Sequence, residues 1–208
     1  MATASITLNP MLTTNAPGLF NVNSAGYTQG DAMDDPAVKF YLNAGVVAAS
    51  ATSPLWGGMP ISESIPSAVS QPGTNILGNT LALATATANA TGICVFNQAQ
   101  AGLTSPSSTA PLFGAGMSAN FYRFGSGARI PLRINPALIS LDGGLISQQV
   151  SWDYTNNWIT TFSVTAFPVK VLNISTSGNK TVGYNTGTGA ANWYSVDPSG
   201  AYVALCLI

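Results

Sequence analysis

The chain has 208 residues, of which 46% are hydrophobic and only 6% are charged, and its formal net charge is -1. Disordered chains are poor in hydrophobic residues, so this composition excludes disorder for most of the sequence. Six basic residues are too few to follow a phosphate backbone, so we expect no nucleic acid among the partners. A protein with so few charges must cover itself with Ser, Thr and Asn or hide much of its surface against other subunits.

Residues 1–30 are rich in Thr, Asn, Ala, Pro and Gly, and their apolar residues occur only as islands. We expect an extended N-terminal arm, followed by a single β-rich domain over residues 31–208 that could be subdivided near residues 103–116. At ~3.3 Å per residue, an arm of this length could reach on the order of 100 Å, enough to cross to a neighbouring subunit. The islands are too widely spaced to build a local core, so we expect four of them to be buried against another chain: Ile6, Leu8, Leu19 and Phe20.

Residues 31–51 are the best helix candidate. We expect this helix to start near Asp35, with Pro36 at its first position, where a missing backbone N–H costs nothing. It could be short, because Gly45 and the β-branched Val46 follow.

The stretch Thr80–Phe96 alternates strictly, with Leu and Thr on one side and Ala on the other. Alternation of this kind predicts a strand, although Ala is depleted in sheets. The stretch lies within a longer charge-free segment, because no charged residue occurs between Glu63 and Arg123. Cys94 and Cys206 stand in apolar surroundings, so we expect two buried thiols rather than a disulfide.

The C-terminal half has strand-like runs over residues 118–125 and 128–136, and then three turn signals. We expect hairpins through residues 155–157, 177–180 and 197–200, the first of which should bury Trp152. The longest apolar runs are too short to span a bilayer, so we expect no membrane segment. Together these patterns predict an all-β fold, an antiparallel sandwich or barrel with an extended N-terminal arm and at most one or two short helices.

The chain contains no histidine. This excludes His-dependent triads and His-ligated zinc, so we expect no catalytic residue, no metal and no cofactor. A hydrolase with paired carboxylates at Glu63 and Asp153 is permitted by the composition, but nothing in the sequence favours it. The acidic group Asp31, Asp34 and Asp35 lacks the spacing of a calcium loop and is better interpreted as a helix entry.

The only basic cluster consists of Arg123, Arg129 and Arg133, on two consecutive predicted strands. Three charges bind a polyanion weakly, so we expect these arginines to pair with an acidic patch on a partner protein. The four tryptophans and the tyrosines could line a sugar-binding platform, but aromatic residues that alternate along strands more often form the core.

The profile resembles tailed-bacteriophage virion structural proteins, and above all the capsid decoration (cement) proteins. Three features carry the resemblance: the charge-free stretch from Ser64 to Tyr122, the uncharged arm "MATASITLNPMLTTNAPGLFNVNSAG", and the hairpin-rich "GGLISQQVSWDYTNNWITTF". The resemblance implies an all-β subunit that is assembled in the host cytoplasm and lies on the capsid exterior of the virion. It further implies a homo-oligomer, often a trimer, that binds the major capsid protein, stabilises the capsid lattice and has no enzymatic activity.

Two other functions fit the same sequence. The first is a phage fibre or tail component, or a carbohydrate-binding module that uses Trp, Tyr and Asn side chains. The second is the acid hydrolase of Glu63 and Asp153 described above.

Overall fold

The computed structural model describes seven ranges of the chain, residues 26–32, 36–64, 79–96, 108–141, 148–176, 178–194 and 202–208. Within these ranges the structure is made of strands, with one four-residue α-helix and two short 3-10 helices. The expected all-β fold is therefore confirmed, and a closed barrel is one of its sheets.

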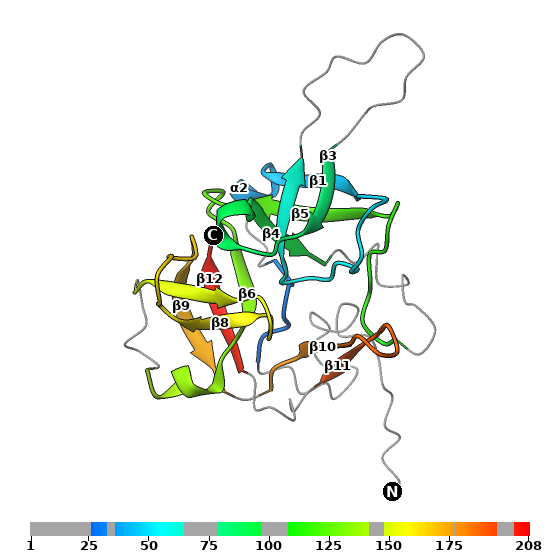
Figure 1. The fold of residues 1–208 in the computed structure, drawn as a ribbon. Helices are drawn as coiled ribbons and strands as arrows, with labels where there is room; N and C mark the ends of the chain where they lie inside the picture. Colours follow the sequence, from blue (N-terminus) through cyan, green and yellow to red (C-terminus); the bar gives the residue numbers. More distant parts are fainter. Residues whose placement is uncertain are drawn as a thin grey trace, which may run out of the picture.

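The first sheet is a closed five-stranded barrel in the order β1-β3-β2-β4-β5, drawn in cyan to green in Figure 1. Its pairings are antiparallel except between β1 and β3, which run parallel. Closure leaves the barrel without an edge strand. The strands are β1 Leu42–Val47, β2 Pro60–Ser64, β3 Asn79–Leu83, β4 Gly92–Val95 and β5 Ser118–Arg123.

The second sheet has five strands in the order β7-β8-β6-β12-β9, so β7 and β9 are its edges. Its pairings are antiparallel except between β6 and β8. Two further strands, β10 Thr181–Asn185 and β11 Ala190–Tyr194, form a separate hairpin. The strands of the second sheet are β6 Arg129–Ile134, β7 Val150–Asp153, β8 Trp158–Thr161, β9 Lys170–Ser175 and β12 Tyr202–Leu207.

The buried side chains form one continuous cluster that includes residues of the barrel and of the second sheet. Residues 108–113, part of the predicted subdivision at 103–116, belong to this cluster through Ala110, Leu112 and Phe113. Backbone pairing of Phe113 with Leu55 fixes this segment further. Residues 110–113, within the predicted subdivision, are therefore packed into the core.

Residues 26–32 join the three sheets, and Figure 1 shows them in blue between the hairpin and the second sheet, running up to the barrel. The side chain of Gln29 is buried; its Nε2 donates to the carbonyl of Gly57, and its Oε1 accepts from the amide of Val182. Gly30 donates its amide to Pro131 on β6 and accepts from Phe96 next to β4. The last residues of the predicted arm over 1–30 therefore lie inside the domain, because they satisfy buried backbone groups of all three sheets.

The helix expected within residues 31–51 is short, as the sequence indicated. It is α2, Pro36–Lys39, and strand β1 begins at Leu42. The stretch Thr80–Phe96 is not one strand. It is divided into β3 and β4 by the 3-10 helix η1, Thr87–Asn89, while the second 3-10 helix, η3, spans Pro136–Leu141.

Of the three predicted hairpins, the structure contains the first, in which β7 and β8 pair antiparallel. The hairpin expected through residues 177–180 is wrong, because β9 pairs with β12 and β10 pairs with β11. The hairpin through residues 197–200 is also wrong, because β12 lies between β6 and β9. The strands on either side of these two turns enter different sheets, which the turn residues alone do not indicate.

Candidate interaction surface

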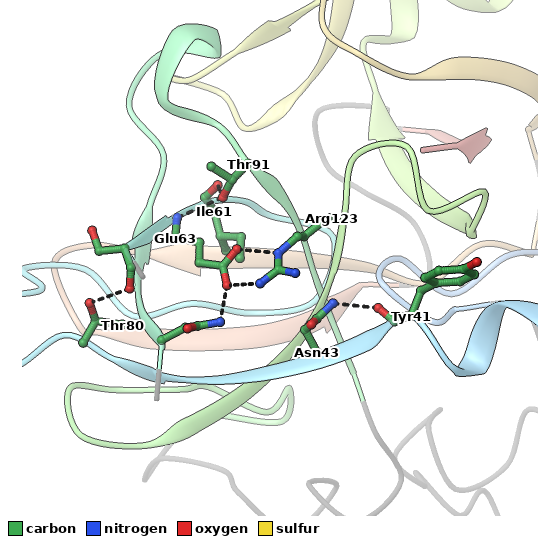
Figure 2. A network of polar contacts seen from close by, with 9 residues as sticks. Tyr41, Asn43, Ile61, Glu63, Thr80, Thr91 and Arg123 are labelled. Atoms are coloured by element: carbon green, nitrogen blue, oxygen red, sulfur yellow. Dashed lines mark hydrogen bonds and ion pairs between the residues drawn. The ribbon is translucent and has the colours of Figure 1, made fainter. Parts of the chain in front are cut away.

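An ion pair between Glu63 and Arg123 lies at one end of the barrel (Figure 2). The guanidinium binds the carboxylate through two hydrogen bonds, from Nε to Oε2 and from Nη2 to Oε1, each 2.7 Å long. Asn79 donates its side-chain amide to Oε1 of the same carboxylate. The Glu63 side chain is 3% exposed and that of Arg123 is 45% exposed, so the carboxylate is withdrawn from water and the guanidinium covers it.

The barrel strands place these side chains on the interior face. Along each strand, side chains alternate between the two faces, and cross-strand partners share a face. Glu63 is two residues from the fully buried Ile61, and Arg123 is two residues from the fully buried Phe121. The Arg123 guanidinium lies 5.9 Å from the ring centroid of Phe121. The ion pair therefore closes the end of an otherwise apolar barrel interior.

Hydrogen bonds hold the backbone around this pair. The amide of Glu63 donates to Oγ1 of Thr91, which in turn donates to the carbonyl of Ile61 (Figure 2). The hydrogen bond to Glu63 raises the pKa of Arg123, and this effect exceeds the opposing effect of partial burial. The arrangement stabilises the charged pair.

Exposed apolar side chains lie just before β1 and on its outward side, and we call them the apolar wall: Phe40, Tyr41, Leu42 and Val46. Phe40 is 91% exposed and Tyr41 is 58% exposed. Leu42 and Val46 project outward from β1, opposite Tyr122 and Ser118 of β5. Large apolar side chains gathered on one face of a soluble protein mark an interaction surface more often than isolated ones do.

No charged residue lies among the outward positions of β1, β3 and β5 that adjoin the wall. These positions alternate with the buried ones and carry Ala44, Thr80, Ala82, Ser118 and Asn120. Lys39, at the end of α2, is the nearest charge in sequence. A partner that covers the wall thus meets apolar groups, hydroxyls and amides, and few charges need to be desolvated.

The three arginines predicted as partner contacts are divided between two sheets, Arg123 on β5 of the barrel and Arg129 and Arg133 on β6 of the second sheet. Arg123 pairs with Glu63 of its own chain, as described above. Arg133 lies over the ring of Trp158, 5.0 Å from its centroid, and donates to the carbonyl of Asn156. Arg129 is exposed at the start of β6. Contact of these residues with a partner stays a prediction, and two of them already bind groups of the same chain.

The four predicted arm contacts, Ile6, Leu8, Leu19 and Phe20, lie outside the described residues. Asp34 and Asp35, of the acidic group, do so as well. Among the described residues, no three His, Cys, Asp or Glu side chains come together to hold a metal ion. In that same part of the chain, no helix is long and apolar enough to cross a membrane.

Asp153, the second carboxylate considered for catalysis, caps the turn between β7 and β8. Its Oδ1 accepts from the amides of Thr155 and Asn156, and its Oδ2 accepts from the side chain of Asn156. Partial burial disfavours the charged carboxylate, but these hydrogen bonds outweigh it and lower the pKa below its ordinary value of 3.8. Asp153 thus stabilises a turn, and Glu63 binds Arg123 and Asn79 on the barrel.

The tryptophans mostly pack against the core. Trp56 is buried and stacks on Tyr184 with ring centroids 5.1 Å apart, and Trp152 is buried beside Phe167 at 5.2 Å. Trp193 packs against Phe96 at 5.2 Å. With Trp158 under Arg133, each of the four rings has a contact within the chain.

Cys94 and Cys206 are both buried and unpaired, as expected. Burial raises the pKa of each thiol far above its ordinary value. They behave as small apolar side chains and are shielded from reagents.

A groove of about 470 Å³ opens where the edge strands β7 and β9 begin. Phe167, Val169 and Ile208, all buried, form its floor together with Leu207. We call it the β9 groove. Its remaining lining residues are Gly125, Gly127, Gln148, Gln149, Pro168 and Lys170.

Comparison of the chain with protein-family models, with curated proteins and with solved structures gives no match. The functional argument therefore depends on the residues and surfaces described above.

The sequence does not indicate the apolar wall, because Phe40 and Tyr41 lie within the helix predicted in residues 31–51. Nor does it indicate the role of Gln29, which was counted in the arm. The one local signal in the sequence is Gly30, the next residue, which the structure places at a φ of +74°, a conformation that glycine adopts readily.

Proposed function

We propose that this protein is a structural subunit of a virus particle, a capsid decoration protein of a tailed bacteriophage that oligomerises and stabilises the capsid lattice from outside. The apolar wall is the observation that carries the proposal. It presents large apolar side chains beside outward positions of β1, β3 and β5 that carry no charge, whereas a protein that stays monomeric normally covers itself with charges.

The distribution of charge supports the same function. The ion pair of Glu63 and Arg123 is satisfied within the chain, so the barrel's contribution to assembly rests on apolar burial and on Ser, Thr and Asn hydrogen bonds. Two of the three described carboxylates have structural roles, since Glu63 serves the ion pair and Asp153 serves a turn cap. Such a surface suits an assembled subunit better than it suits a catalyst.

The first experiment measures the number of copies in purified particles. Quantitative mass spectrometry against the major capsid protein should give hundreds of copies per particle, as a lattice requires. A few copies per particle would replace the decoration function with a tail or fibre function. Absence from particles would overturn both.

The second experiment tests the wall itself. Phe40→Ser combined with Leu42→Ser should weaken the homo-oligomer at least ten-fold in sedimentation experiments while leaving the monomer folded, because both side chains are exposed. Val164→Ser is the matched control, since Val164 is 87% exposed in the segment after β8 and lies outside the wall. Equal weakening by the control, or none by the double variant, would contradict a role of the wall in assembly.

A further inference from the structure

The β9 groove has the chemistry of a site for an apolar side chain. Its floor is apolar, and its only charged lining residue is Lys170. The groove is open beside Gly125 and Gly127, because the space that a Cβ would occupy at either position has no other atom within 4 Å. An aromatic or aliphatic side chain from an uncharged segment would bury its surface there without leaving a charge unpaired.

The groove lies at the beginning of a strand edge that is open among the described strands. Strand β9 pairs with β12 on one side, and no described strand pairs with its other side. The backbone groups along such an edge can pair with an added extended segment. A segment that runs along β9 toward Lys170 would therefore arrive at the groove.

The N-terminal segment enters the domain at the opposite end of β9. The side chain of Asn173 donates to the hydroxyl of Tyr27, and the amide of Tyr27 donates to Asn179, which itself donates to the carbonyl of Ser175. Tyr27 is thus held beside the second half of β9. The chain from Phe20 to Gly26 spans about 20 Å when extended, close to the roughly 17 Å from Ser175 back to Lys170.

The sequence of this segment has the pattern of a strand. "FNVNS", residues 20–24, alternates apolar and polar side chains and carries no charge. Pro17 and Gly18 come just before it, and residues of these types mark the boundary at which a strand begins.

We propose that residues 20–25 add to the open edge of β9 in the same chain, parallel to it, and that Phe20 fills the β9 groove. Attachment within one chain is favoured over attachment between copies, because the short connection gives the segment a high effective concentration at the groove. This inference rests on the proposed function in one respect. That function requires part of the arm to contact another chain, and residues 1–18, with Ile6 and Leu8, remain for this contact. It revises the expectation that Leu19 and Phe20 contact another chain.

The test uses the full-length chain with two introduced cysteines, Asn21→Cys and Gln149→Cys, and a short bis-maleimide reagent. Cys94 and Cys206 are buried and should not react. The control pair is Asn21→Cys with Thr188→Cys. Thr188 is exposed in the turn after β10, a strand that also begins beside the entry of the N-terminal segment, so a freely moving arm would reach it about as readily.

We expect the first pair to crosslink within one chain at least ten times faster than the control, and Phe20→Ser to abolish the difference. Equal rates for the two pairs would overturn docking in the groove. A crosslink that joins two copies would overturn attachment within one chain in favour of arm exchange. Sedimentation of the unmodified protein reports assembly separately, so an oligomer without the crosslink would contradict this inference and leave the proposed function standing.

Discussion

Glu63 and Arg123 border the charge-free stretch of the sequence, and in the folded chain they pair with each other across the end of the barrel. They are 60 positions apart, on β2 and β5, which are not neighbours in the barrel. The segment between them supplies strands β3 and β4 of the barrel. Because these strands carry no charge, they place no second charged group near the pair. A desolvated carboxylate is tolerated there because two guanidinium donors and the Asn79 amide bind it.

Removal of the guanidinium should therefore destabilise the fold. In Arg123→Met the Glu63 carboxylate keeps its burial and loses its charged partner, which we expect to lower the free energy of unfolding by about 1–3 kcal/mol. The lower part of that range allows for the partial exposure of Arg123. Arg129→Met is the control, since Arg129 is exposed on β6, and it should change stability by less than about 0.5 kcal/mol in urea titrations. Similar values for the two variants would show that the pair contributes little.

This pairing illustrates what the sequence could and could not predict. The absence of charge between Glu63 and Arg123 is visible in the sequence. The pairing itself depends on which strands close the barrel, and a cross-barrel contact leaves no local periodicity in the sequence. The same reason explains why the arginine cluster was expected to face a partner.

The stretch Thr80–Phe96 shows a second limit. Its alternation predicts one strand, yet Asn89 accepts a hydrogen bond from the amide of Ala86 and donates to Thr85, which folds the middle into a turn. Polar side chains of this kind offer the backbone an alternative to a strand ladder. The alternating pattern is therefore correct for β3 and β4 separately, and local hydrogen bonds interrupt it between them.

Trp152 packs against Phe167 beneath the hairpin of β7 and β8. We expect Trp152→Ala to cost roughly 3–5 kcal/mol, because it leaves a cavity in the core. Trp152→Phe should cost clearly less, since a ring remains against Phe167. Guanidinium unfolding of the two variants checks this order. An alanine variant as stable as the wild type would contradict the placement of the indole in the core.

Asp153 should make stability depend on pH. Because its pKa is lower in the folded chain than its ordinary value, its contribution is fully present above about pH 4 and is lost as the pH falls through the lower folded value. In Asp153→Asn we expect a loss below about 1 kcal/mol at pH 7, given the exposure of the turn, and a smaller difference from wild type near pH 3. Urea titrations at both pH values measure it.

In the turn between β10 and β11, a carboxylate can be introduced instead of removed. Asn185 accepts from the amides of Gly187 and Thr188, at the same spacing as Asp153 with Thr155 and Asn156. Asn185→Asp should therefore add stability at pH 7 relative to pH 3. If neither substitution changes the pH dependence, the carboxylate of Asp153 does not act through these hydrogen bonds.

Assembly through uncharged contacts should be insensitive to salt. Screening weakens interactions between charges, and the wall has none, so the oligomer should persist from about 0.05 to about 1 M salt. Sedimentation velocity across that range measures it. Dissociation caused by salt alone would show that charged contacts, such as those expected of the arginines, hold the subunits together.

The last prediction concerns Gly30, which fixes residues 26–32 between the sheets. Gly30 and Gly116 both have a positive φ, +74° and +80°, so an alanine at either position suffers similar backbone strain. The two positions differ in the space available for a Cβ atom. A Cβ at Gly30 would lie 2.2 Å from the backbone carbon of Gly57, whereas a Cβ at Gly116 would meet nothing within 4 Å. Gly116→Ala should cost about 1–2 kcal/mol, from the strain alone.

Gly30→Ala should cost at least about 3 kcal/mol or prevent folding, because the Cβ would overlap the backbone of Gly57 and Gly58, which cannot move aside as a flexible side chain could. The effect of alanine on the unfolded chain is alike at the two positions, so the difference between the variants isolates the close approach to Gly57. Thermal unfolding of both variants under identical conditions provides the comparison. If Gly30→Ala unfolds at the same temperature as Gly116→Ala, Gly30 does not lie against Gly57, and the predicted arm would extend further along the chain than the structure places it.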